Sequence, residues 1–203
     1  MPSLTRPSVL SVPASSKTAE LGRSSALPWT RYLVFFGLAT VGCGADLLSK
    51  HWVFAWRGLP RPDNVWWIWE PFFGIETAIN TGALFGMGAG NGRFFAVLSV
   101  AAGFGILIWL FYARAARDAW LTSALGCVMA GILGNLYDRL GLWNKPGMPD
   151  EWGSAVRDWI LFRYGSFTWP NFNIADSLLV CGAAMLMWHA MREQPKSASK
   201  VSG

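Results

Sequence analysis

Apolar residues in this chain are gathered into four long blocks, rather than spread at the short repeats of a globular core. The blocks cover about residues 32–49, 94–112, 120–137 and 174–191. Each approaches the roughly 20 residues that a helix needs to cross a bilayer. The pattern therefore predicts a membrane all-α bundle of four transmembrane helices, with both chain ends on the same side of the membrane.

Two longer and more polar stretches, about 50–93 and 138–173, are predicted to emerge together on the opposite side. The first mixes alternating positions with aromatic doublets in Val65–Trp69 and Phe72–Ile75. This mixture predicts short strands and a platform that rests on the lipid headgroups. The bundle is therefore expected to carry a small extracytoplasmic segment that is β-rich or interfacial.

The two ends of the chain differ from the predicted four-helix domain, which covers residues 29–192. Residues 1–28 are rich in Ser and Pro with scattered basic residues, which predicts a disordered tail without a secretory signal. Residues 193–203 form a second tail. Lys and Arg are nearly balanced between the two sides, but those closest to the block ends favour cytoplasmic termini: Arg31, Arg114, Arg117 and Arg192.

The amino-acid composition supports a membrane protein and favours lipids over nucleic acid as its partners. Only 14% of the residues are charged, against about a quarter in soluble domains, and the 13 tryptophans suit the headgroup boundary. The net charge of +5 comes without a basic run or stripe, so we expect anionic lipids rather than nucleic acid as the counter-charge. The three cysteines lie inside apolar blocks and do not form a disulfide framework.

The chain lacks the residue patterns of several common hydrolases. Its two histidines, His51 and His189, are predicted to lie near opposite membrane faces, which leaves a serine or cysteine triad without a base. No His-Glu-x-x-His zinc motif, phosphate-binding loop or dinucleotide fingerprint occurs. We therefore expect chemistry without a metal or a cofactor.

Four aspartates are predicted to lie at or just beyond the outer ends of the spans: Asp46, Asp138, Asp158 and Asp176. Acids at a membrane boundary are costly unless they are partnered or functional. Two carboxyls within hydrogen-bonding distance share a proton, so that one can accept a proton from water while the other protonates an amide. This is the chemistry of an aspartic protease, although spacing alone does not choose between Asp158 and Asp138.

Simpler interpretations of the same acids remain open at this point. Asp158 is also placed for an ion pair with Arg157 or Arg163, and Asp176 for a favourable position near a helix dipole. A proton-conducting bundle would use membrane acids as well, but deep within the spans rather than at their ends. A structural scaffold gives no reason for Asn and Asp to recur together in three separate motifs.

Five motifs, in order along the chain, resemble those of one family. They are Asp46-Leu47-Leu48-Ser49-Lys50, Asn80-Thr81-Gly82-Ala83-Leu84-Phe85-Gly86, Gly131-Ile132-Leu133-Gly134-Asn135-Leu136-Tyr137-Asp138-Arg139, Val156-Arg157-Asp158-Trp159 and Phe172-Asn173-Ile174-Ala175-Asp176. Over about residues 32–191 the chain resembles the bacterial lipoprotein signal peptidases, or signal peptidase II. Each motif alone is weakly specific, whereas five in order among four spans are highly specific.

The resemblance implies an aspartic endopeptidase of the bacterial inner membrane, with its site on the extracytoplasmic side. Its substrates would be prolipoproteins whose cleavage-site cysteine already carries diacylglycerol, in contact with membrane lipids. By motif position, Asp158 and Asp176 correspond to the catalytic pair. Asp138 and Arg139 correspond to supporting residues, and the resemblance implies no metal. Arg139 is placed to hold Asp138 or a lipid phosphate, or to brace the fold.

The remaining motif residues have a functional and a structural interpretation each. Asn135 and Asn173 each offer an amide that suits an extended substrate backbone, and Asn173 also suits a helix cap. Asn80, with Gly82, faces substrate or forms a plain turn. Asp46 and Lys50 are four residues apart, which predicts an ion pair within the helix in preference to substrate contact.

Several positions distinguish this chain within the resemblance. Gly131 and Gly134 are expected at helix-packing contacts, where they let neighbouring backbones approach. Ala175 is expected among the residues that support the site. The stretch 143–151, within a 142–155 insertion, looks longer than the family's connection, and we expect it to cover the site as a flap. Leu84 replaces an Ala, and Trp159 replaces a Phe that would border the pocket.

Overall fold

The computed structural model describes residues 26–82 and 88–192, so residues 1–25 of the first predicted tail and all of the second lie outside the described residues. It contains four helices that are long and apolar enough to cross a membrane. These are α1 (Trp29–Arg57), α2 (Gly92–Leu107) with its π-helical continuation η3 (Ile108–Tyr112), α3 (Ala119–Arg139) and α4 (Ile174–Arg192). All four predicted blocks are therefore helical in this part of the chain.

Helix α1 is longer than predicted, and this changes the position of its polar residues. Its 29 residues correspond to roughly 44 Å of helix, whereas a bilayer's hydrocarbon core is about 30 Å thick. Helix α1 continues past Asp46 to Arg57, so the position of this acid at the outer end of the membrane-spanning part stays a prediction. Asp46 and Lys50 lie inside α1, are fully buried, and pair with each other, so their charges do not end the helix.

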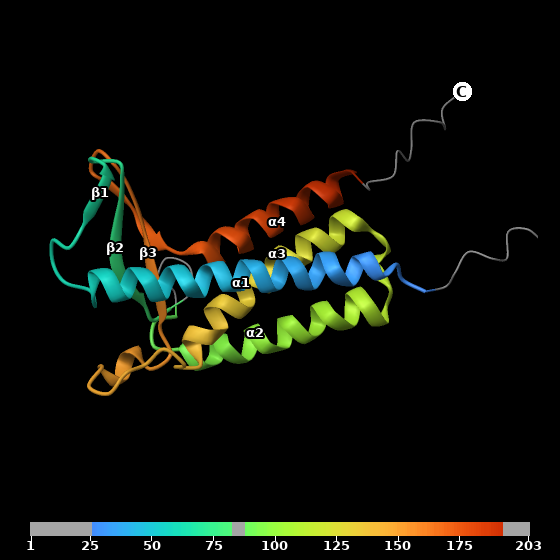
Figure 1. Ribbon diagram of the computed structural model, residues 1–203, viewed down its shortest axis with the longest axis horizontal. Helices are drawn as coiled ribbons and strands as arrows, with labels where there is room; N and C mark the ends of the chain where they lie inside the picture. Colours follow the sequence, from blue (N-terminus) through green and yellow to red (C-terminus); the bar gives the residue numbers. More distant parts are fainter. Residues whose placement is uncertain (1–25, 83–87, 193–203) are drawn as a thin grey trace, which may run out of the picture.

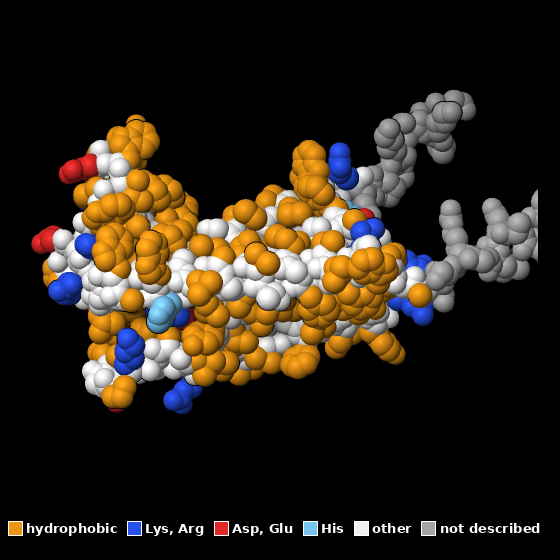
Figure 2. Space-filling model, in the orientation of Figure 1, with side chains coloured by type: hydrophobic (Ala, Val, Ile, Leu, Met, Phe, Trp, Pro, Cys, Tyr) orange, Lys and Arg blue, Asp and Glu red, His pale blue; other side chains and the backbone are white. Residues whose placement is uncertain are grey.

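Helix α3 is the central helix of the bundle and packs against the other three. Both ends of the described chain lie at one end of the bundle, and the strands lie at the other (Figure 1). Near the end that carries the termini, an apolar core joins α1, η3 and α3 around Phe35, Leu110 and Leu125. On the face seen in Figure 2, hydrophobic side chains cover much of the middle of the bundle, while charged side chains lie mostly toward its two ends.

Glycines on α3 allow its neighbours to approach closely, as the sequence predicted. A Cβ at Gly131 would lie 2.5 Å from the Ala175 carbonyl oxygen on α4. A Cβ at Gly134 would lie 2.6 Å from Asp46 Oδ2 on α1 and 3.1 Å from the Ala175 Cβ. The start of α4 is therefore held against α1 and α3 at one level of the bundle.

A four-stranded antiparallel sheet covers the end of the bundle opposite the termini (Figure 1). Its order follows the sequence: β1 (Trp66–Trp69), β2 (Phe73–Asn80), β3 (Val156–Tyr164) and β4 (Phe167–Phe172). Strands were predicted only in the first connecting stretch, so the second pair was missed. Stacked rings of Phe73, Phe162 and Phe172 join β2, β3 and β4 across the sheet.

Short helical turns complete the described chain. Turn η4 (Ala115–Arg117) joins η3 to α3, and Asp118 caps α3 by accepting a hydrogen bond from the Leu121 N–H. Turn η5 (Asp150–Trp152) lies in the long connection between α3 and β3.

Candidate active site

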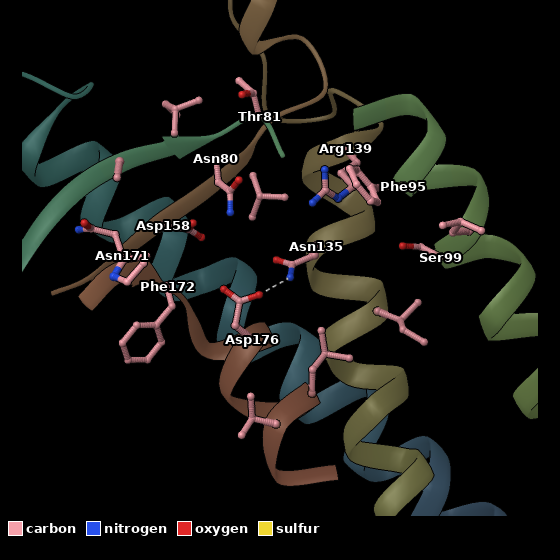
Figure 3. A pocket seen from close by; sticks show the side chains of 18 of the residues that line it. Asn80, Thr81, Phe95, Ser99, Asn135, Arg139, Asp158, Asn171, Phe172 and Asp176 are labelled. Atoms are coloured by element: carbon pink, nitrogen blue, oxygen red, sulfur yellow. Dashed lines mark hydrogen bonds between the residues drawn. The ribbon is translucent and has the colours of Figure 1, made fainter. Parts of the chain in front are cut away.

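A cavity of about 780 Å³ lies between the sheet and helices α2, α3 and α4. Asp158 and Asp176 both line it, from β3 and from the first turn of α4 respectively (Figure 3). Asn80, Asn135 and Arg139 line the same cavity from β2 and α3. Two acids that lie 18 positions apart in the sequence therefore face one space, as the acid–base hypothesis requires.

The start of α4 orients Asp176. The Asn173 side-chain Oδ1 accepts a hydrogen bond from the Asp176 N–H over 2.9 Å, while Asp176 Oδ2 accepts one from the Asn173 N–H over 3.2 Å. This reciprocal pair is a capping box, which satisfies two backbone donors at the start of a helix. The predicted cap role of Asn173 is thus confirmed, and the cap fixes the direction of one candidate catalytic carboxylate.

The Asn173 side chain also reaches the second acid. Its Nδ2 donates to Asp158 Oδ1 over 2.6 Å and lies 3.3 Å from the Arg157 carbonyl oxygen. Because buried Asn173 contacts both Asp158 and Asp176, it fixes the position of strand β3 relative to the start of helix α4.

Asn135 of α3 lies beside Asp176. Its Nδ2 donates to Asp176 Oδ1 over 2.8 Å, the bond drawn in Figure 3. Its Oδ1 accepts hydrogen bonds from Lys50 Nζ at 2.9 Å and from Asn173 Nδ2 at 3.1 Å. Asn135 therefore connects the candidate catalytic carboxylate to the buried charges behind it.

The two acids have different surroundings. Asp158 is 2% exposed, whereas Asp176 is only partly buried. Burial raises the pKa of Asp158 well above its usual range, and the nearby charge of Asp176 raises it further. Lys50 and hydrogen bonds from Asn173 and Asn80 oppose this rise in pKa. Asp158 therefore keeps its proton to a higher pH than an exposed aspartate does.

Four buried charged side chains form a cluster beside the site: Asp46, Lys50, Asp138 and Arg157. Lys50 Nζ lies 2.7 Å from Asp46 Oδ2, which confirms the predicted pair, and 3.2 Å from Asp138 Oδ2. Asp46 Oδ1 also accepts a hydrogen bond from the Ala175 N–H over 2.9 Å, which ties α1 to the start of α4.

Asp138 is paired differently from the expectation that joined it to Arg139. Arg157 of β3 donates to Asp138 Oδ1 through Nε at 3.1 Å and Nη2 at 2.7 Å, a two-pronged pair that excludes water. Pairing of Asp158 with Arg157 was one of the simpler interpretations, but the Arg157 guanidinium binds Asp138 instead. Sequence reasoning missed this role of Arg157, because nothing in the sequence distinguishes it from Arg163.

Arg139 instead connects α3 to the end of β2. Its Nη2 donates to the Gly82 carbonyl oxygen over 2.8 Å, and its guanidinium lies 5.0 Å from the centroid of the Phe95 ring on α2. The Gly82 N–H donates to Asn80 Oδ1 over 3.0 Å, as in the predicted turn. Residues 83–86 of this motif, including Leu84, lie outside the described residues.

Two expectations about the cavity wall are wrong. No residue of the 143–151 stretch lines the cavity within the described part of the chain, so this stretch is not a flap over it. Trp159 does not line it either, because neighbouring strand residues face opposite sides and Asp158 faces the cavity. Helix α2 contributes lining residues that the sequence did not suggest, among them Phe95 and Ser99.

The described residues contain no cluster of three or more His, Cys, Asp or Glu side chains that is suited to a metal ion. The polar side chains that line the cavity carry carboxyls, amides, hydroxyls and one guanidinium. Such a set can bind an extended peptide backbone and move protons to and from it.

Comparisons with known proteins agree on one family. Residues 38–192 match the family model described as Signal peptidase (SPase) II. A protein named lipoprotein signal peptidase from Rhodopirellula baltica is 58% identical over 176 residues, covering 86% of this chain and 78% of the relative. A protein of the same name from Polynucleobacter necessarius is 35% identical over 164 residues, covering 79% of this chain and 91% of the relative.

Solved structures agree with the fold. A bacterial membrane enzyme determined by the in meso method at 2.3 Å resolution superposes with a TM-score of 0.66 at 21% identity. The match covers 86% of this chain and 95% of that structure. Four helices with a small sheet at one end are therefore an architecture that is already known among bacterial membrane enzymes.

Proposed function

The chain belongs to the signal peptidase II family, and we propose that Asp158 and Asp176 are the catalytic pair of this aspartic endopeptidase. The reaction is the removal of signal peptides from prolipoproteins, by cleavage before a cysteine that carries diacylglycerol. One observation carries the proposal: two carboxyls from separate elements face one cavity and are joined through Asn173.

The hydrogen bonds of the two acids favour different roles. Both oxygens of Asp176 accept hydrogen bonds from N–H donors, on Asn135 and on the Asn173 backbone, as an ionised carboxylate does. The raised pKa of buried Asp158 favours this acid as the one that holds the proton. Asp176 accordingly accepts a proton from the attacking water, and Asp158 donates its proton to the nitrogen of the cleaved amide.

Polar groups at the rim of the cavity bind the substrate backbone. Asn80 and Arg139 lie on the opposite wall from Asp176 (Figure 3), and each carries N–H donors for substrate carbonyl oxygens. Arg139 is held in place by Gly82 and Phe95, which leaves its guanidinium positioned without the substrate. Preorganised donors of this kind stabilise the negative charge that develops on the carbonyl oxygen.

The position of the site within the bundle suits a substrate that is anchored in the bilayer. Apolar residues of α2 and α4 wall the cavity on the bundle side, including Leu98 and Val180. The signal-peptide helix and the acyl chains remain in the hydrocarbon, while the scissile amide meets water at the level of Asp158. The membrane is the bacterial inner membrane, with the sheet outside and both terminal tails, 1–28 and 193–203, in the cytoplasm.

The proposal is tested by cleavage of a purified prolipoprotein in detergent, with and without the diacylglyceryl group on its cysteine. Mass spectrometry of the products should show one cut, directly before the modified cysteine, and no cut in the unmodified substrate. Cleavage at another bond, or equal cleavage of both substrates, would contradict the proposed substrate class.

A further inference from the structure

Arg157, the residue directly before Asp158 in β3, is held by two helices. Its backbone N–H donates to Asp138 Oδ2 of α3 over 3.0 Å, and its carbonyl oxygen lies 3.3 Å from Asn173 Nδ2 at the start of α4. Its guanidinium binds Asp138 Oδ1 through two nitrogens. Because adjacent residues of a strand move together, the position of Asp158 depends on that of Arg157.

The sheet secures this part of β3 on one side only. Strand β2 pairs with it through Ala78 opposite Asp158 and Ile79 opposite Arg157, but pairing with β4 begins at Ile160. Asp138 and Asn173 take the place of a second strand here, through the hydrogen bonds to Arg157. A loss of order in the Arg157 side chain would therefore reach Asp158 with strand pairing to restrain it on one side only.

The Arg157 guanidinium lies in an aromatic corner formed by the long connection and α1. It is 5.1 Å from the ring centroid of Trp143 and 5.9 Å from that of Phe54, and the two rings meet edge to face at 6.0 Å. A guanidinium is attracted to an aromatic face, more strongly when water is excluded, and Arg157 is only 5% exposed.

Trp143 is itself anchored next to β3. Its indole N–H donates to the Ala155 carbonyl oxygen over 3.3 Å, and the side-chain amide of Asn144 donates to the Gly153 carbonyl oxygen over 3.1 Å. These two bonds close the base of the long connection, whose residues do not line the described cavity. The connection therefore packs against the start of β3, away from the cavity.

We propose that Trp143 is a positioning residue, which holds Asp158 at its working place by keeping the Arg157 guanidinium on Asp138. The proposal rests on the proposed catalytic role of Asp158. Without the indole, the guanidinium gains water and rotational freedom, and the start of β3 loses its fixed distance from α3 and α4. Because Trp143 does not touch the cavity, its loss should lower kcat and leave KM unchanged.

The test compares three variants of the full chain with wild type, on a diacylglyceryl-modified prolipoprotein in detergent. Trp143→Leu removes the aromatic face, Trp143→Phe retains a face without the N–H, and Trp152→Leu is the same substitution elsewhere in the connection. A misplacement of about 1 Å at a catalytic group costs up to roughly 100-fold in rate, so we expect kcat of Trp143→Leu to fall roughly tenfold. Trp143→Phe should regain most of the rate, and Trp152→Leu should match wild type.

Each alternative outcome would overturn the proposal. Wild-type kcat in Trp143→Leu would show that Asp158 needs no such support, and a raised KM with normal kcat would make the connection a substrate contact. Equal losses in Trp143→Leu and Trp152→Leu, or no recovery in Trp143→Phe, would indicate general loosening. If Trp143→Leu does not fold, Trp143→Met takes its place with the same expectations. Cleavage of the substrate by the wild-type protein tests the proposed function, whereas the comparison among the variants tests the role of Trp143 alone.

Discussion

Replacing Asp138 by Asn removes one charge from a buried cluster that is otherwise balanced. The cluster contains two acids, Asp46 and Asp138, and two bases, Lys50 and Arg157, which pair at 2.7 to 3.2 Å. Asp138 has no exposed surface and is the acid bound by both bases. The variant therefore leaves one positive charge uncompensated in a site that water does not reach.

The expected destabilisation follows from the fate of that charge. Removing one partner of a buried ion pair costs about 3–5 kcal/mol, because the remaining charge keeps its desolvation penalty without its attraction. For a domain of this size, each kcal/mol lowers Tm by about 2–4 °C, which gives a fall of about 6–20 °C. The double variant Asp138→Asn, Arg157→Gln restores the charge balance and should lose less than the two single variants lose together.

Thermal unfolding in detergent micelles, followed by tryptophan fluorescence, measures these differences. Asp150→Asn is the matched control, because Asp150 is an exposed acid in the connection that follows α3. The account of the cluster would be refuted by an Asp138→Asn variant within about 1 kcal/mol of wild type. It would also be refuted if the two single effects simply added, since contacting residues couple by about 0.5–3 kcal/mol.

Three further predictions concern the acids, the cap and the helix contacts. The cleavage rate should fall as pH rises through the raised pKa of Asp158. The folded protein should lose stability over the same rise in pH, because the native carboxyl binds its proton more tightly than the unfolded one. Unfolding of Asp158→Asn measured across pH should no longer show that loss of stability. Asn173→Ala should cost about 1 kcal/mol of stability and most of the cleavage rate, whereas Asn173→Ser should regain stability as a cap but not the rate. Gly131→Ala should lower stability by about 1–3 kcal/mol in thermal unfolding, whereas Gly105→Ala, which meets nothing within 4 Å, should not.

The sequence predicted the helices well because each apolar block is long and uninterrupted. It predicted the strands poorly, since β3 and β4 follow the long connection and carry a mixture of charged and aromatic residues. Their pairing depends on β2, which is distant in the sequence and contributes Phe73 opposite Phe162. Non-local pairing of this kind has no short-range signal in one sequence.

The members of the candidate site were predictable, but their partners were not. Four-residue spacing predicted the pair of Asp46 and Lys50, whereas the link from Lys50 to Asp138 crosses between helices. The place of Arg157 beside Asp138 follows from the register of β3 against α3, which no motif specifies. Chain neighbours such as Asp138 and Arg139 face different ways on a helix, so of the roles left open for Arg139 the structure favours the bond that braces Gly82 over a pair with Asp138.

The most direct test of the account is cleavage of the diacylglyceryl-modified prolipoprotein by Asp158→Asn and by Asp176→Asn, beside Asp150→Asn. All three variants should fold, since Asn retains the shape of Asp. At positions 158 and 176 the Asn side-chain oxygen can still accept the hydrogen bond from Asn173, and Asp150 is exposed. We predict that the first two give no cleavage above background and that the third cleaves like wild type. Cleavage within about tenfold of wild type by a folded Asp158→Asn or Asp176→Asn variant would contradict the assignment, because one acid alone cannot both accept and donate the proton in the transition state.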